Sequence, residues 1–207
     1  MRKLSLKALL ATSTLLASTM FLPVSAHAKC TAPAAADDLT DEQVVEIYDC
    51  IREKLRAGYA KSDNEWAKEY TTWGATASRP ANPGPHGGRF LNTFVNEVGL
   101  EEYLKFSDER EENPMPVGTI VAKESFKVNK KNAVKKGPLF FMEKVAAGTA
   151  DEYGNWVYTA IQPNGKPVKA SQKFCHDCHG AFSDQDALGY PDEDVRLVSE
   201  EKKESSN

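Results

Sequence analysis

The sequence lacks an apolar run long enough to cross a membrane, and it has little cysteine and histidine. There are four cysteines and four histidines among 207 residues. The apolar stretch from Leu9 to Leu22 is interrupted by Ser and Thr and is shorter than the roughly 20 residues that a membrane-spanning helix needs. We therefore expect no membrane insertion, and any redox or metal chemistry must depend on a handful of residues.

An excess of basic residues is also missing. The chain has 26 Lys and Arg against 30 Asp and Glu, so its formal net charge is −4. Proteins that bind nucleic acid need clustered Lys and Arg, and an acidic chain is repelled by an anionic membrane surface. This composition argues against both partners and leaves small-molecule ligands open.

The first 28 residues have the organisation of a secretory signal. A basic segment containing Arg2, Lys3 and Lys7 precedes the apolar stretch, and Ala26-His27-Ala28 fits the small-x-small rule for cleavage. We predict export to the periplasm and cleavage near Ala28. Removing 28 residues leaves 179, and removing three basic residues changes the formal charge from −4 to −7. A chain of this length is typical of one domain.

The residue pattern of this domain, 29–198, predicts an α+β fold. Capping boxes at Thr40–Gln43 and Ser62–Glu65 indicate two helices in an N-terminal extension of about residues 29–73. A loop rich in Gly and Pro follows, and then the apolar pattern changes to that of antiparallel strands. We expect strands at 89–96, 117–128, 139–145 and 155–162, short helices at 97–106 and 171–182, and a disordered tail at 199–207.

Two cysteines lie in Cys175-His176-Asp177-Cys178-His179, which is the attachment signature of haem c. On a helix, residues i and i+3 share a face, so both thiols can form thioether bonds with the vinyl groups of one haem. His179 can then offer a ring nitrogen to the iron. We predict one covalent haem c, held by Cys175 and Cys178, with His179 as the axial ligand. The imidazole of His176, between the cysteines, is expected to face solvent.

Alternative roles for the cysteines fit less well. A zinc ribbon needs a second closely spaced pair, and Cys30 and Cys50 are 20 residues apart. A thioredoxin-like redox site needs a βαβ frame, which this pattern does not have. In an oxidising compartment we expect Cys30 and Cys50 to form a disulfide, which contributes about 3 kcal/mol on the chain-entropy model.

The sixth ligand of the iron distinguishes a ligand-binding haem from an electron carrier. The candidates outside the motif are His86, Met115 and Met142. None has flanking features that mark it as a ligand, so we favour an open distal face. The alternative is a simple electron-transfer cytochrome c with Met142 or His86 as the sixth ligand.

Several segments between Arg89 and Arg196 occur in a familiar order and spacing. They are Arg89–Asn96, Gly118–Glu124, Gly137–Met142, Asn155–Tyr158 and the haem motif, followed by Asp186–Tyr190. Together they resemble the cytochrome P-460 family, with its relative cytochrome c′-beta. The resemblance implies a mainly antiparallel sheet with a few helices, a homodimer, and a haem whose distal side is open.

The resemblance also implies two functions. In the enzyme members a lysine is cross-linked to the haem ring, and these proteins oxidise hydroxylamine and pass electrons to another cytochrome. In the c′-beta members the cross-link is absent, apolar residues cap the distal side, and the haem binds nitric oxide. By motif, the cross-linking position falls on Lys123.

Two features bear on the choice between these functions. Hydroxylamine oxidation needs a base, and the carboxylate expected shortly before the haem motif is missing from Gln162–Phe174, so Glu124 or Glu143 would have to replace it. Nitric oxide binding needs an apolar distal wall. The candidates for that wall are Phe90, Phe94, Phe140 and Phe141.

Overall fold

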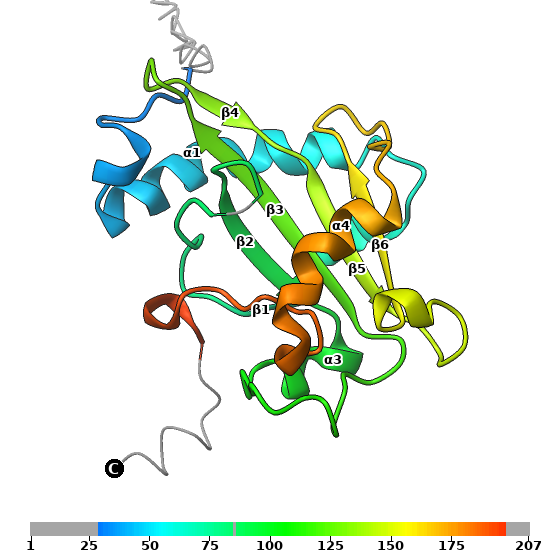
Figure 1. The fold of residues 1–207 in the computed structure, drawn as a ribbon. Helices are drawn as coiled ribbons and strands as arrows, with labels where there is room; N and C mark the ends of the chain where they lie inside the picture. Colours follow the sequence, from blue (N-terminus) through cyan, green and yellow to red (C-terminus); the bar gives the residue numbers. More distant parts are fainter. Residues whose placement is uncertain (1–28, 85, 198–207) are drawn as a thin grey trace, which may run out of the picture.

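A computed structural model of the protein describes residues 29–84 and 86–197. These residues form an antiparallel sheet with helices on both of its faces, which confirms the predicted α+β class (Figure 1). The predicted signal peptide, 1–28, and the predicted tail, 199–207, lie outside the described residues. Within the described part of the chain, no helix is long and apolar enough to cross a membrane.

The sheet has β3 at its centre. Its strand order is β1-β2-β3-β5-β6, and β4 pairs with the end of β3. The strands are β1 (Gly74–Ala75), β2 (Phe90–Val95), β3 (Ile120–Val128), β4 (Val134–Lys136), β5 (Leu139–Lys144) and β6 (Trp156–Ile161). All neighbouring strands are antiparallel. The four longer predicted strands are therefore present, and each ends within a few residues of its expected bounds.

In the described part of the chain, four α-helices surround the sheet: α1 (Asp41–Tyr59), α2 (Trp66–Glu69), α3 (Glu97–Tyr103) and α4 (Gln172–His179). The capping box of α1 forms as predicted, because the Thr40 side chain and Gln43 bond reciprocally. The second predicted box is wrong. The side chain of Asn64, and not that of Ser62, accepts a hydrogen bond from the Ala67 N–H at 3.3 Å, so α2 starts later and is only one turn long.

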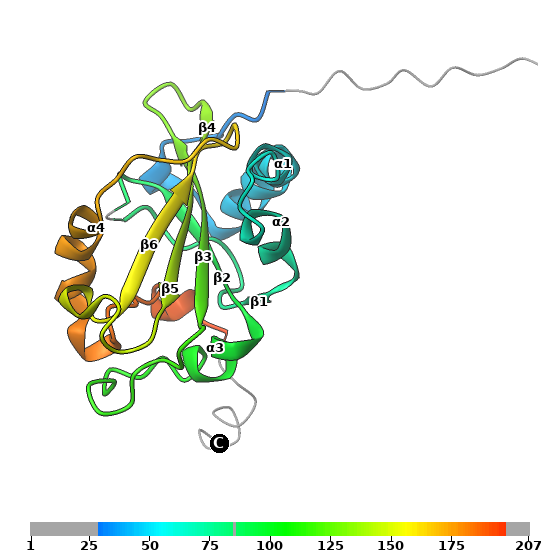
Figure 2. The same ribbon diagram turned by 90° about the vertical axis from the view of Figure 1, so that its right-hand side faces the viewer.

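The alternation of side chains along the strands separates two buried regions. Seen along the sheet edge, α1 and α2 cover one face, while α4 covers the other (Figure 2). Phe90, Phe94 and Phe126 point to the side of α1. Val121 and Met142 point to the side of α4. Because side chains in a strand alternate with a period of two, each strand contributes to both regions.

A buried carboxylate joins α1 to the sheet. Glu124 of β3 is 1% exposed. It accepts hydrogen bonds from the Tyr48 hydroxyl, from the Tyr70 hydroxyl at 2.6 Å and from Nε of Arg56 at 3.0 Å. Burial and the charge of Glu124 raise the pKa of both tyrosines above the ordinary range, so they remain donors. The cluster compensates the cost of burying a charge with three donors, one of which is cationic.

The predicted disulfide between Cys30 and Cys50 is present. It links the segment before the first helix to the middle of α1. The loop that it closes spans 20 residues. The bond therefore holds the start of the described chain against the same helix that carries Arg56 and Tyr48.

Replacing Arg56 by Met tests the Glu124 cluster. The change leaves the buried carboxylate without its cation, and we expect the free energy of unfolding to fall by about 2 kcal/mol, less than for a fully buried pair because Arg56 is partly exposed. Arg52 on the same helix is the matched control, since both side chains of its ion pair with Asp49 are exposed. In urea unfolding, Arg52→Met should cost under about 1 kcal/mol. Equal losses in the two variants would contradict this account.

Candidate haem site

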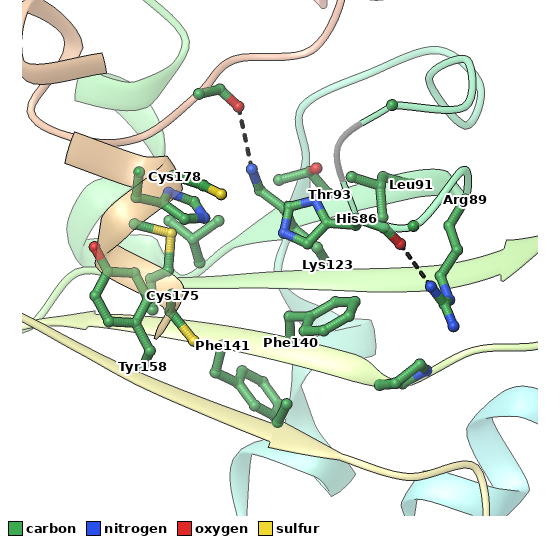
Figure 3. A pocket seen from close by; sticks show the side chains of 18 of the residues that line it. His86, Arg89, Leu91, Thr93, Lys123, Phe140, Phe141, Tyr158, Cys175 and Cys178 are labelled. Atoms are coloured by element: carbon green, nitrogen blue, oxygen red, sulfur yellow. Dashed lines mark hydrogen bonds between the residues drawn. The ribbon is translucent and has the colours of Figure 1, made fainter. Parts of the chain in front are cut away.

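A cavity of about 640 Å³ lies between the sheet and α4 (Figure 3). One row of paired residues across four strands, Thr93, Lys123, Phe140 and Ala160, forms part of its floor. A second row contributes Val121, Met142 and Tyr158. The volume falls within the range of roughly 300–1,000 Å³ that is typical of ligand and cofactor sites.

Helix α4 brings the motif residues to this cavity. The Ser171 side chain caps the helix by accepting a hydrogen bond from the Phe174 N–H at 3.1 Å. Cys175, Cys178 and His179 then all line the cavity, and neither cysteine is in a disulfide. The structure therefore places two free thiols, spaced by one helical turn, beside an imidazole at the edge of an apolar space.

The ring of His179 has a fixed orientation. Its Nδ1 lies 2.6 Å from the carbonyl oxygen of Ala187. Since a carbonyl can only accept, Nδ1 carries the proton and the Nε2 lone pair is free. Burial, together with the charge of Lys123, lowers the pKa of His179 to about 4, so the ring is neutral at neutral pH. Histidines that bind metals commonly donate their other N–H in this way.

The turn that supplies the Ala187 carbonyl is held on two sides. Asp186 and Ala187 both adopt positive φ angles, of 53° and 61°. The Asp186 carboxylate pairs with Nζ of Lys144 at 2.6 Å, and both side chains are largely buried. The indole N–H of Trp156 donates to the Asp186 carbonyl at 2.7 Å. The sequence shows these residues, but no local pattern indicates that they meet, so sequence reasoning missed this positioning role.

The next two carbonyls of the same turn bind Lys123. Its side chain is 6% exposed, and Nζ donates to the carbonyl oxygens of Leu188 at 3.2 Å and Gly189 at 3.1 Å. No ion pair to Lys123 occurs among residues 29–84 and 86–197. Burial lowers the pKa of Lys123 to about 8, so a much larger share of the amine is uncharged than in a solvated lysine. Lys123 thus lines the cavity, although isolated lysines in strands are ordinarily exposed.

The three candidates for a sixth ligand lie in different places. Met115 is buried beside the sheet and does not line the cavity, whereas Met142 does. His86 also lines it, and its ring centre lies 5.9 Å from that of His179 and 4.9 Å from that of Phe140. Burial is the main cause that lowers the pKa of His86, to about 3, so this second imidazole is also neutral.

The predicted aromatic wall is wrong for two of its four residues. Phe140 lines the cavity, but Phe90 and Phe94 point to the α1 side of the sheet. Phe141 reaches the cavity boundary, yet its ring packs against Trp66 and Trp73 on the α1 side. Both faces of these strands are apolar, so the sequence pattern alone did not identify which phenylalanines face α4.

The carboxylates named as substitute bases do not reach the cavity. Glu124 lies on the opposite face of the sheet from Lys123, since consecutive residues of a strand point in opposite directions. Glu143 is not among the residues that line the cavity. Within the described chain, Asp192 is the acidic residue of the lining, and it is exposed at the rim.

His176 is more enclosed than expected, because it is half-buried and its ring has partners on the sheet side. Its Nδ1 lies 3.3 Å from the hydroxyl of Tyr158, and its ring packs against Tyr153. The ring of Tyr158 contacts His179 as well, at 5.3 Å between ring centres. Tyr158 therefore bridges the two histidines of the motif from β6.

A separate metal centre is not indicated by this arrangement. In the part of the chain that the structure describes, no group of three or more His, Cys, Asp or Glu side chains is placed to hold a metal ion. The zinc alternative thus has no ligand set here. The residues that converge are instead two thiols, neutral imidazoles and an apolar lining, which fit a covalently attached haem.

The fold and cavity define an α+β protein with a cofactor site on the covered face of its sheet. The sequence model of one family, Cytochrome P460, matches residues 65–188, more than half of the chain. The protein therefore belongs to the cytochrome P460 family of haem-binding cytochromes. The match includes α2, so it begins before the segments that carry the resemblance, while α1 and the disulfide precede it. No curated protein matches the chain.

Replacing Asp186 by Asn tests the turn that orients His179. The change leaves the Lys144 ammonium buried without its anion, so we expect the free energy of unfolding to fall by about 3 kcal/mol. Asp184, an exposed carboxylate two residues away, supplies the control. Asp184→Asn should change stability by no more than about 0.5 kcal/mol. A urea titration that finds Asp186→Asn as stable as the control would show that the ion pair does not hold the turn.

Proposed function

We propose that this protein is an exported, periplasmic cytochrome that carries one haem c and binds nitric oxide as its small-molecule ligand. The observation that carries the proposal is the convergence of Cys175, Cys178 and the neutral His179 imidazole on one cavity. Haem c would supply an iron centre that takes up small ligands and exchanges electrons. The protein's own residues determine where that centre lies and what can reach it.

The attachment rests on the geometry of α4. Cys175 and Cys178 are one turn apart and both border the cavity, so each thiol can bond to one vinyl group of the same haem. His179 follows directly, and its bond to the Ala187 carbonyl leaves Nε2 as the only nitrogen with a free lone pair. These three residues are the ones that would hold a single haem.

The lining favours binding over oxidation chemistry. Leu91, Val121, Phe140 and Met142 supply apolar surface, and the acidic lining residue Asp192 is exposed at the rim. Oxidation of hydroxylamine releases protons along with electrons, so it needs a base close to the substrate. Nitric oxide is small and uncharged, and an apolar interior with no internal carboxylate suits it better.

A second function, hydroxylamine oxidation, is supported by one observation. Lys123 is buried in the cavity, and its lowered pKa, about 8, makes the amine more nucleophilic than an exposed lysine. A cross-link to the haem ring, as the resemblance implies for enzyme members, would require such an amine. In that case the electrons would leave through a partner cytochrome.

Mutation of the motif cysteines tests the attachment. The variant Cys175→Ala with Cys178→Ala is produced in a host that attaches haem c. We expect it to carry no haem after denaturation, as measured by the mass of the intact protein. The matched control replaces the other pair, Cys30→Ser with Cys50→Ser. That variant should be less stable by about 3 kcal/mol but should keep its haem. Haem retained in the first variant would refute covalent attachment through these thiols.

Replacing Lys123 by Met separates the two functions. If the protein binds nitric oxide without a cross-link, the ferrous Soret band should have the same position in wild type and Lys123→Met. Both proteins should then bind nitric oxide and leave hydroxylamine unoxidised. A strongly red-shifted Soret band in wild type that disappears in Lys123→Met, together with hydroxylamine turnover, would instead establish the enzymatic function.

A further inference from the structure

Two histidines from distant parts of the chain face each other in the cavity. His179 comes from α4. His86 comes from the loop between β1 and β2 (Figure 3). Their ring centres are 5.9 Å apart and the ring planes are inclined by 62°. His86 was one of several candidates on sequence alone, but the structure distinguishes it from the others.

The spacing of the two rings matches a shared metal. Histidine nitrogens lie about 2 Å from metals that they bind. With roughly 1 Å from each nitrogen to its ring centre, two imidazoles on opposite sides of one metal have centres roughly 6 Å apart. The observed 5.9 Å agrees with this value. Edge-to-face packing of two rings also places their centres about 4.5–7 Å apart, so the spacing permits a shared metal but does not by itself require one.

The environment of His86 leaves its ring available. Its Nδ1 is buried and has no hydrogen-bond partner in the described chain. The backbone is nevertheless fixed, because Nη1 of Arg89 donates to the His86 carbonyl at 2.6 Å. Gly87 and Gly88 follow with φ angles of 74° and 64°, which side chains with a Cβ rarely adopt. Leaving a buried ring nitrogen unsatisfied is costly, so this nitrogen is available to a group bound in the cavity.

Lys123 and Met142, two further groups of the lining that could bind iron, are already engaged. Lys123 Nζ donates to the carbonyl oxygens of Leu188 and Gly189. Met142 is 4% exposed and packs in the buried cluster that includes Val121 and Trp156. His86 therefore has a nitrogen free to bind iron, unlike the engaged groups of Lys123 and Met142.

We propose that His86 is the second axial ligand of the haem iron in the resting protein, on the side opposite His179. The inference rests on the proposed haem attachment and deepens the proposed function. A small ligand then binds by exchange, in which the bond from His86 to iron breaks as the new bond forms and the freed loop residue stays in the cavity. The distal side is thus closed by a displaceable side chain and is not open at rest.

The test is the spin state of the haem-loaded, full-length protein, measured by absorption and by electron paramagnetic resonance. Wild type should be low-spin and six-coordinate. His86→Ala should be high-spin and five-coordinate, and its ferrous form should bind carbon monoxide at least about 10-fold more tightly, because only a minor fraction of wild type is free to bind at rest. His86→Met is a second variant that keeps a ligand, so it should stay low-spin with a raised reduction potential.

Met142→Leu is the matched control, since Met142 lines the same cavity and the change conserves volume. It should keep the wild-type spectrum. A high-spin wild-type protein, or loss of the low-spin signal in Met142→Leu, would overturn the assignment of His86. The haem content is measured separately on each sample. Protein without haem would show that the proposed attachment has failed, whatever the role of His86.

Discussion

The hydrogen bond between His179 and the Ala187 carbonyl is the interaction on which the site depends. It sets the tautomer of the imidazole and turns its free nitrogen toward the cavity. The carbonyl keeps its place because the turn that contains it is fixed by the ion pair between Lys144 and Asp186 and by the indole of Trp156. Lys123 binds the next carbonyls of the same turn. One short backbone segment thus orients two of the functional groups.

One face of the sheet, covered by α1, stabilises the fold, and the other face, covered by α4, holds the candidate haem site. On the α1 side, Glu124 is satisfied by a cation and two hydroxyls, and the disulfide holds the helix to the preceding segment. On the α4 side, the cavity is lined by strands that cannot move without disrupting the other face. Consecutive residues of β3, Lys123 and Glu124, belong to the two sides. A rigid scaffold of this kind fixes a cofactor more reliably than loops can.

Much of this organisation could be predicted from sequence because it follows from local patterns. The motif helix, the α1 capping box and the longer strands came from spacing rules that act over a few residues. The Cys30–Cys50 bond came from elimination, because the other two cysteines belong to the haem motif. The failures concern contacts between distant segments. Strands that are apolar on both faces do not reveal which one meets α4, so Phe90 and Phe94 were misplaced. The approach of His86 to His179 and the role of Asp186 depend on packing that no local pattern encodes.

Peptide mapping of the exported protein shows whether one haem is bonded to the protein through α4. After denaturation and cleavage with trypsin, the account predicts that haem remains on the single peptide that contains both Cys175 and Cys178, with no free thiol on either. It also predicts that Cys30 and Cys50 occur together as a haem-free disulfide. Recovery of the α4 peptide without haem, with its cysteines free or bonded to each other, would contradict the account.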